Sequence, residues 1–346
     1  MFSVTDDEGE LPLIRFFSDF LPGLPILSLL VALGGIRARV MGSNQEVFIE
    51  NVGTSLGFSA DQSSAHFERH DRQILAFGEE GQKRIRSLRI GVVGLGGTGS
   101  IVAHELAHLG AHDVTLIDPD LVETSNLNRL LGATPDDVGQ AKVAVAKRSI
   151  LAISRGAQVR ALDADVTSEA AARALLDCSI IFCCTDSHGS RAILNQICYQ
   201  YFIPVIDIGV SLTAKNGLLT HINGRVQLLT PGLGCLTCGE FLNPDQVRRD
   251  LMSENERLND PYFDSSEGQA QPAVISINGT VSSLALTMFL GVVTAIPVDY
   301  RYQLYDGLSG RLRSIEHQPR PGCITCSPDG AYARGDTWEL PTRKAP

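Results

Sequence analysis

Residues 89–99 read RIGVVGLGGTG. The first five residues form a short apolar run of the kind that makes a buried strand, and residues 94–99 fit the pattern G-x-G-x-x-G. A run with helical character, residues 100–109, follows without a break. Glycines between a strand and a helix let the backbone approach phosphate groups at the positive N-terminus of that helix. The stretch therefore predicts a nucleotide-binding strand–loop–helix unit.

The sequence on the C-terminal side of this unit keeps alternating between strand and helix patterns. Strands are predicted at 114–117, 158–162, 179–184 and 204–208, and helices at 141–152, 168–176 and 190–201. Repeated strand–helix units predict an α/β fold with a doubly wound, mainly parallel Rossmann-like sheet. Beyond Gly209 the pattern changes to a smaller mixed β region around an apolar helix at 274–290; its predicted strands are 217–222, 225–229, 301–305 and 312–316.

The overall charge and the N-terminal segment exclude several classes of protein. The net charge of -10 over 346 residues argues against a nucleic-acid partner, because phosphate-backbone binding needs a basic surface. The N-terminus is acidic and lacks the basic start of a signal peptide. The apolar stretch 21–36 is interrupted by prolines and glycines and is too short to span a bilayer. We therefore expect a cytoplasmic protein without a membrane partner.

Polar residues beyond the second strand bear on which nucleotide is bound. Asp118 ends that strand, where an acid can bond ribose hydroxyls. Asn126, Arg129 and Lys142 follow. Taken singly, each is more readily explained as a turn former or a surface charge. Taken together, they favour an enzyme that displaces pyrophosphate from ATP, since such an enzyme must neutralise the β- and γ-phosphates.

Asp186 lies just after the predicted strand 179–184, at an edge where open α/β sheets bind ligands. A carboxylate there can hold Mg²⁺ between triphosphate oxygens. The alternative is that Asp186 caps the helix that follows, a role for which Asp is well suited. The residue by itself does not decide between these two interpretations.

Six motifs in order resemble the ThiF/MoeB/ubiquitin-activating (HesA-MoeB-ThiF) family of adenylyltransferases. They are RHDRQ at 69–73, GLGGTG at 94–99, DPD at 118–120, SNLNR at 125–129, GQAK at 139–142 and TD at 185–186. The resemblance covers residues 66–330. One departure is Leu130-Leu131, where the family usually has Gln after the Arg.

The resemblance implies a role for each matching residue. Asp118 would bind the ribose, and Asp186 would bind the magnesium needed for adenylation. Arg72 would act as an arginine finger on the neighbouring subunit's ATP, which implies a homodimer. The nucleotide loop would be Gly94, Gly96, Gly97 and Gly99, and the phosphate contacts would come from Asn126, Arg129 and Lys142.

Two C-x-x-C pairs predict a structural zinc. Cys235 and Cys238 form the first, Cys323 and Cys326 the second, and each follows a Pro-Gly turn. Four thiolates leave no open position for water, so a Zn²⁺ held by them serves the fold rather than catalysis. Four unrelated buried thiols are the less favoured alternative.

The resemblance implies ATP-dependent adenylation of a C-terminal carboxylate. Its bearer would be a ubiquitin-like or sulfur-carrier protein or a peptide, and the segment 239–272 would cover the groove for that tail. No cysteine lies between Cys238 and Cys323, so we expect no thioester on this chain. The remaining cysteines, at 178, 183, 184 and 198, are predicted to pack in the core. A NAD-dependent oxidoreductase and a nucleotide-binding pseudoenzyme scaffold remain as alternatives.

Residues 1–60 form a separate β-rich region by pattern, joined by the polar linker 59–64. Residues 27–33 and 36–40 predict a hairpin around Gly34-Gly35. The stretch from Ser3 to Asp6 resembles the last part of the metal motif of JAB-type metallopeptidases, but the preceding H-x-H is absent. We expect a truncated, inactive relative of such a domain or an unrelated cap. Residues 331–346 form a tail.

Overall fold

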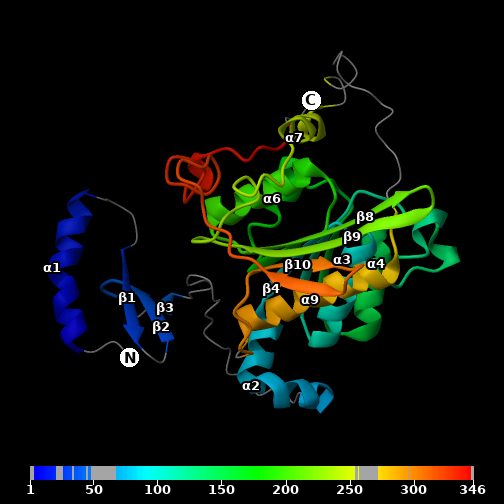
Figure 1. Cartoon of the computed structure of the whole chain (residues 1–346). Coiled ribbons are helices and arrows are strands. Elements are labelled where there is room, and N and C mark those ends of the chain that lie inside the picture. Colours follow the sequence, from blue (N-terminus) through cyan, green and yellow to red (C-terminus); the bar gives the residue numbers. More distant parts are fainter. Residues whose placement is uncertain are drawn as a thin grey trace. The chain divides into compact units, whose positions relative to one another are not determined.

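The computed structural model describes residues 4–20, 26–32, 35–43, 46–47, 68–253, 256, 272–294 and 296–343. Two compact units make up the chain, Met1–Gln62 and Ser63–Pro346. Figure 1 shows the whole chain coloured along the sequence.

The first unit combines a helix, α1 (Val4–Phe20), with a three-stranded antiparallel sheet of β1 (Leu27–Ala32), β2 (Gly35–Val40) and β3 (Glu46–Val47). The predicted hairpin pairs as expected, but Gly35 already belongs to β2 and faces Ala32. A buried ion pair joins helix and sheet: Arg39 Nη2 lies 3.0 Å from Glu10 Oε1. The sequence did not predict α1, which contains Asp6 of the JAB-like stretch. That resemblance remains a prediction.

The second unit is built on one eight-stranded sheet in the order β11-β10-β9-β8-β7-β4-β5-β6. Strands β8, β7, β4, β5 and β6 are parallel to one another, and β9, β10 and β11 are added antiparallel at the β8 edge. The α/β fold with a doubly wound, mainly parallel sheet is therefore confirmed. The strands are β4 (Arg89–Val93), β5 (Asp113–Ile117), β6 (Gln158–Leu162), β7 (Ile180–Cys183), β8 (Val205–Lys215), β9 (Leu218–Leu229), β10 (Tyr302–Asp306) and β11 (Arg311–Ser314).

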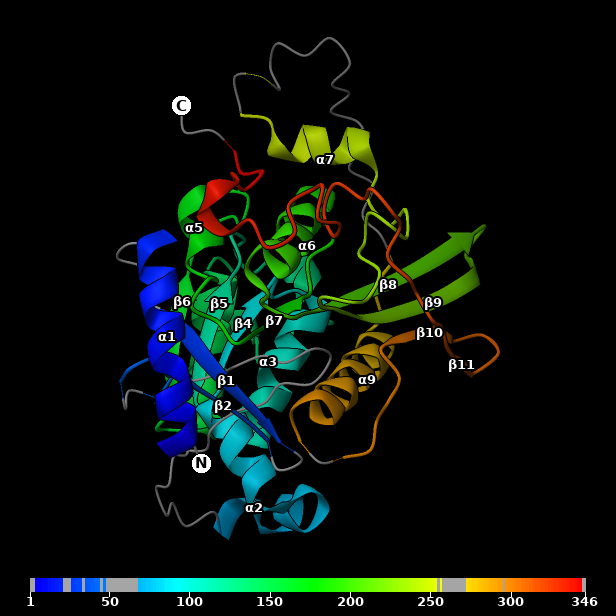
Figure 2. The same ribbon diagram turned by 90° about the vertical axis from the view of Figure 1, so that its left-hand side faces the viewer.

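Helices cover both faces of this sheet, as Figure 2 shows for α5 and α6 on one face and α3 and α9 on the other. Ile90, Val92 and Ile181 are fully buried between them, because a parallel sheet covered on both faces needs apolar strands. The helices are α2 (Asp71–Ser87), α3 (Gly97–Leu109), α4 (Lys142–Ile153), α5 (Glu169–Arg173), α6 (His188–Tyr201), α7 (Pro244–Leu251) and α9 (Ile275–Val293).

Strand β9 corrects the prediction of two separate strands at 217–222 and 225–229. The prediction broke at Asn223-Gly224, a pair typical of turns, but both residues continue the ladder, opposite Ser211 and Val210. Gly224 serves packing: a Cβ there would collide with the side chain of Val281 on α9. A glycine within a strand can mark such a close approach of another element.

Helix α9 is the one helix among the described residues that is long and apolar enough to cross a bilayer. It packs on α3, β8 and β9, and Val281 and Met288 are fully buried. Its hydroxyls also serve the fold, since Ser282 Oγ donates to the Thr98 carbonyl, 3.2 Å away. The contacts are those of a core helix.

Candidate functional site

The glycine loop forms where the carboxyl ends of β4, β5 and β7 meet. The Gly94 N–H donates to the carbonyl of Ile117 at the end of β5, 2.9 Å away. Gly94 has a φ of 84°, a conformation that favours glycine. A Cβ on Gly94 would also lie 2.8 Å from the backbone nitrogen of Thr185. The loop therefore fits directly against the segment that carries Asp186.

The open side of the loop faces away from these strands. Apart from Gly96 itself and its two chain neighbours, no described residue has an atom within 4 Å of the position that a Cβ of Gly96 would take. A Cβ on Gly97 would collide with the Asn278 amide and lie 3.5 Å from Arg129 Cδ. Arg129 thus lies beside the loop, as a phosphate ligand must. Asn278, at the start of α9, is a neighbour that the sequence did not reveal, since 181 residues separate it from Gly97.

Asp118 is buried beneath the loop and supports its backbone. Its Oδ2 accepts from the Leu95 N–H at 2.6 Å, and its Oδ1 accepts from the Asp120 N–H at 2.8 Å. Burial raises the pKa of Asp118, although Lys142 and the two N–H groups act in the opposite direction. The Lys142 ammonium lies 4.0 Å from Asp118 Oδ1 and 2.7 Å from Asp120 Oδ2. Lys142 is therefore held next to the carboxylate expected to bind ribose.

The segment around Arg129 is fixed by its own hydrogen bonds. Arg129 Nη1 donates to the Ser125 carbonyl at 2.6 Å and to Asn128 Oδ1 at 3.2 Å. Asn126 is mostly buried, and its side chain forms a capping box with Glu123. Leu130, where the sequence departs from the family pattern, packs on Val122 and Val145. The departure therefore contributes to an apolar cluster and leaves Arg129 in place.

Asp186 and Arg72, the two remaining residues with a predicted catalytic role, are both exposed. Asp186 follows β7 and precedes α6, beside the glycine loop. Its neighbour Ser187, rather than Asp186, is the N-cap of α6 and accepts from the Ser190 N–H. Arg72 lies in the first turn of α2, and the adjacent Gln73 fastens that helix by donating to the His108 carbonyl at 3.0 Å.

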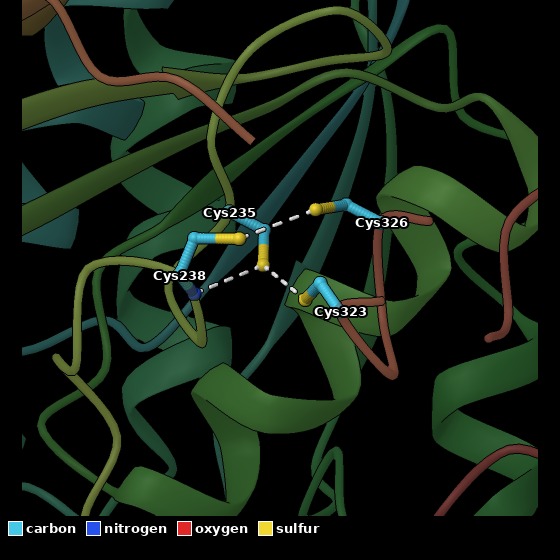
Figure 3. A group of neighbouring side chains, drawn as sticks. All are labelled: Cys235, Cys238, Cys323 and Cys326. Atoms are coloured by element: carbon cyan, nitrogen blue, oxygen red, sulfur yellow. Dashed lines mark hydrogen bonds between the residues drawn. The ribbon is translucent and has the colours of Figure 1, made fainter. Parts of the chain in front are cut away.

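The four predicted metal ligands come together, as Figure 3 shows. Cys235 Sγ lies 3.6 Å from Cys323 Sγ, and Cys238 Sγ lies 3.4 Å from Cys326 Sγ. All four sulfur atoms lie within 4.8 Å of one another. Zn–S bonds of about 2.3 Å in a tetrahedron place sulfur atoms about 3.8 Å apart. The cluster therefore fits a Cys₄ zinc site.

Local contacts prepare this cluster for a cation. The backbone N–H groups of Cys238 and Arg320 donate to Cys235 Sγ and Cys238 Sγ, at 3.3 and 3.2 Å. Hydrogen bonding from the Cys326 thiol lowers the pKa of Cys235 and, in return, raises the pKa of Cys326, so the pair favours one thiolate. Donors directed at sulfur favour the thiolate form that binds metal. The cluster is buried in the core and joins the segment after β9 to the C-terminal segment.

Comparisons with known proteins agree with this geometry. The model of the ThiF family matches residues 70–325. The chain belongs to the ThiF family. It is 27% identical to the sulfur carrier protein ThiS adenylyltransferase of Escherichia coli (strain K12), over 77% of this chain and 97% of that protein. It is 26% identical to the molybdopterin-synthase adenylyltransferase of Salmonella typhimurium (strain LT2), over 77% and 99%.

A solved structure shares the fold of this ThiF-family chain. E. coli MccB with MccA-N7isoASN superimposes with a TM-score of 0.60, covering 87% of this chain and 98% of that one, at 18% identity. The predicted family is thus confirmed, and the curated relatives named here are adenylyltransferases that match nearly along their whole length. The family match and these relatives are consistent with this chain being an adenylyltransferase.

We predict one zinc per chain by elemental analysis. Cys235→Ser should lose the metal and several kcal/mol of stability, since structural zinc sites contribute about 10 kcal/mol or more of apparent binding free energy. Cys198→Ser is the matched control, because it alters a buried thiol of the same core cluster outside the four ligands. A stable, active and metal-free Cys235→Ser protein would exclude a structural zinc.

Proposed function

We propose that this chain adenylates a C-terminal carboxylate with ATP and releases pyrophosphate. The observation that supports it best is the meeting of three groups at one edge of the sheet: the open glycine loop, the acid and lysine pair Asp118–Lys142, and the exposed Asp186. Hydride transfer would use the glycine loop and a ribose acid but has no need for Arg129, Lys142 and Asp186. Family membership favours the same conclusion.

The nucleotide would lie with its phosphates over Gly96 and its ribose near Asp118. Arg129 and Lys142, which now contact Ser125 and Asp120, would turn toward the phosphates. Arg129 is partly exposed beside the loop, whereas the Lys142 side chain is 11% exposed and would exchange Asp120 for a phosphate. Positive charge placed where pyrophosphate departs stabilises the transition state. Asn126 would contribute to phosphate binding through the backbone of its turn, which its capping box with Glu123 holds in place.

Asp186 would hold Mg²⁺, which neutralises the triphosphate during attack at the α-phosphate. The donor set fits this ion, because protein sites for Mg²⁺ usually supply one or two carboxylates and leave the other positions to phosphate oxygens and water. Asp186 is exposed, and no hydrogen bond or ion pair joins it to another residue in the described part of the chain. The Arg191 guanidinium acts on it only through its charge, so the carboxylate oxygens remain available.

The substrate would be the tail of a ubiquitin-like or sulfur-carrier protein or of a peptide. The name of one relative points to the sulfur-carrier class. The segment proposed to cover the tail, 239–272, includes α7, but residues 254, 255 and 257–271 lie outside those described. We further propose a cytoplasmic homodimer in which the exposed Arg72 reaches the partner's ATP, and a structural Zn²⁺ in the Cys₄ site.

The burial of the other cysteines supports direct transfer from the adenylate. Cys178, Cys183 and Cys198 are buried, and Cys184 is half-buried. Burial raises the pKa of Cys178 to about 12 and raises the pKa of the other three as well. A thiol that stays protonated is a poor nucleophile. Cys198 is fully buried, in line with the prediction that it packs in the core.

Asp186→Asn should lower ATP–pyrophosphate exchange by a hundredfold or more, because losing the Mg²⁺ ligand removes several kcal/mol of transition-state stabilisation. Exchange is measured with labelled pyrophosphate and the small carrier proteins and peptides of the source organism. Asp177→Asn, an exposed residue before the other end of β7, is the control. Exchange near the wild-type rate in Asp186→Asn would refute this role.

Mixing tests whether Arg72 acts across a dimer. Arg72→Ala and Asp186→Asn chains should each be inactive, and a mixed dimer has one site with both residues intact. We expect up to about half of the wild-type activity per mixed dimer, because its two sites act separately. Native mass spectrometry confirms subunit exchange. No recovery after exchange would mean that Arg72 does not act in the partner's site.

Incubation with ATP and the carrier should leave no thiol-labile adduct on this chain. The reason is that each of the eight cysteines is either in the Cys₄ cluster or carries a raised thiol pKa. Intact mass spectrometry with and without reductant makes the measurement. An adduct mapped to any cysteine would show that the chain does form a thioester.

A further inference from the structure

The residues on either side of Asp186 are held by different parts of the fold. On the N-terminal side, Arg191 Nε donates to the Thr185 carbonyl at 3.1 Å, and Arg191 Nη2 donates to the Ile208 carbonyl at 3.1 Å. Arg191 Nε lies 3.5 Å from Asp207 Oδ1, and Arg225 Nη2 lies 2.5 Å from Asp207 Oδ2. Asp207 is fully buried. Thr185 is therefore fixed to the interior of the sheet.

The C-terminal side is held by α7 instead. One oxygen of Asp250, Oδ2, accepts from both Ser187 Oγ and the Gly189 N–H, each at 2.8 Å. At the other end of α7, the Asn243 N–H donates to His188 Nδ1 at 3.1 Å. Both ends of α7 therefore rest on the three residues that directly follow Asp186.

Helix α7 depends on these contacts for its position. It has no buried residue, although Leu251 packs on the edge of the core. Gly189 allows the close approach, since a Cβ there would lie 2.5 Å from Asp250 Cβ. The C-terminal tail also holds α7 in place. Arg343 Nε donates to the Asp250 carbonyl at 2.9 Å, and Arg343 Nη2 lies 3.1 Å from Asp165 Oδ2.

The start of α6 is a place where a carboxylate is stabilised. N–H groups of the first helical turn have no partner within the helix and attract acidic side chains. Asp186 precedes the N-cap Ser187, and Asp is itself a good capping residue. Yet Asp250, which is 63 residues from Ser187 in the chain, takes the donors of Ser187 and Gly189. Asp186 makes no such bond among the described residues.

We propose that Asp250 is a positioning residue that occupies the donors at the start of α6 and so keeps Asp186 free to bind Mg²⁺, an inference that rests on the function proposed above. Without Asp250, the Ser187 hydroxyl and the Gly189 N–H would be left for the Asp186 carboxylate. Asp186 would then turn toward the helix as a cap and away from the phosphates. Docking of α7 thus controls whether Asp186 acts as a cap or as a metal ligand.

The test measures Mg²⁺ binding rather than turnover. ATP binding is followed by calorimetry at increasing Mg²⁺. Asp250→Ala should raise the half-saturating Mg²⁺ concentration about tenfold or more, the effect typical of lost outer-shell partners of a metal ligand. ATP binding without divalent metal should not change. Asp250→Asn should stay near wild type, since an amide oxygen can accept both hydrogen bonds.

Two further variants separate position from charge. Gly189→Ala keeps the Asp250 carboxylate but pushes it away, so it should shift the Mg²⁺ dependence in the same direction as Asp250→Ala. Asp245→Ala is the matched control, because Asp245 is an exposed acid on the same helix, and the substitution keeps the backbone N–H that donates to Asn243 Oδ1. It should leave the Mg²⁺ dependence unchanged.

Unchanged half-saturation in Asp250→Ala and Gly189→Ala would overturn the inference. A lower thermal midpoint with normal Mg²⁺ dependence would also overturn it, since Asp250 would then serve the fold alone. In both cases wild-type ATP binding that depends on Mg²⁺ would leave the proposed function standing. A wild-type chain that binds no ATP would overturn the proposed function, and this inference with it.

Discussion

The close contact between the ends of β4 and β7 is the constraint on which the rest of the site depends. Gly94 turns at a positive φ and bonds the end of β5, while a side chain at this position would meet the backbone of Cys184 and Thr185. Because glycine has no Cβ, three parallel strands can end at one place. The glycine loop and the segment that carries Asp186 then lie side by side, although about 90 residues separate them along the chain.

The two buried carboxylates near the site, Asp118 and Asp207, are each accompanied by cations. The buried Asp118 carboxylate accepts hydrogen bonds from two backbone N–H groups and lies close to the Lys142 ammonium. Asp207 is paired with two arginines, and the Arg225 guanidinium lies 4.3 Å from the centre of the Phe241 ring. Unpaired buried charges cost several kcal/mol, whereas paired ones can be kept. Asp186 contrasts with these because it is exposed, which suits the Mg²⁺-binding role proposed for it.

The Cys₄ cluster and the tail stabilise the unit around the same helix, α6. Tyr199 Oη donates to the Leu233 carbonyl near the first cysteine pair, and Asn195 Oδ1 accepts from the Leu236 N–H. Gln200 Nε2 donates to the carbonyls of Gly335 and Trp338 in the tail. The helix that begins beside Asp186 is thus fastened along its length by segments far away in the sequence. Rigid support of this kind is what holds a functional side chain in position.

The sequence by itself determined the parts whose chemistry is local. A strand, a G-x-G-x-x-G loop and a helix are adjacent along the chain, so their pattern predicted the fold and the nucleotide loop, and two C-x-x-C pairs predicted the metal cluster. The prediction of a strand break at Asn223-Gly224 was wrong. The pair has the local signature of a turn, but the packing of Val281 requires the glycine within a strand. Only the tertiary structure decided that Asn278 lies at the loop and that Arg191 and Asp250 hold the two sides of Asp186. Those contacts join side chains from separate elements, and their geometry follows from how helices pack on the sheet, which no pattern of neighbouring residues records.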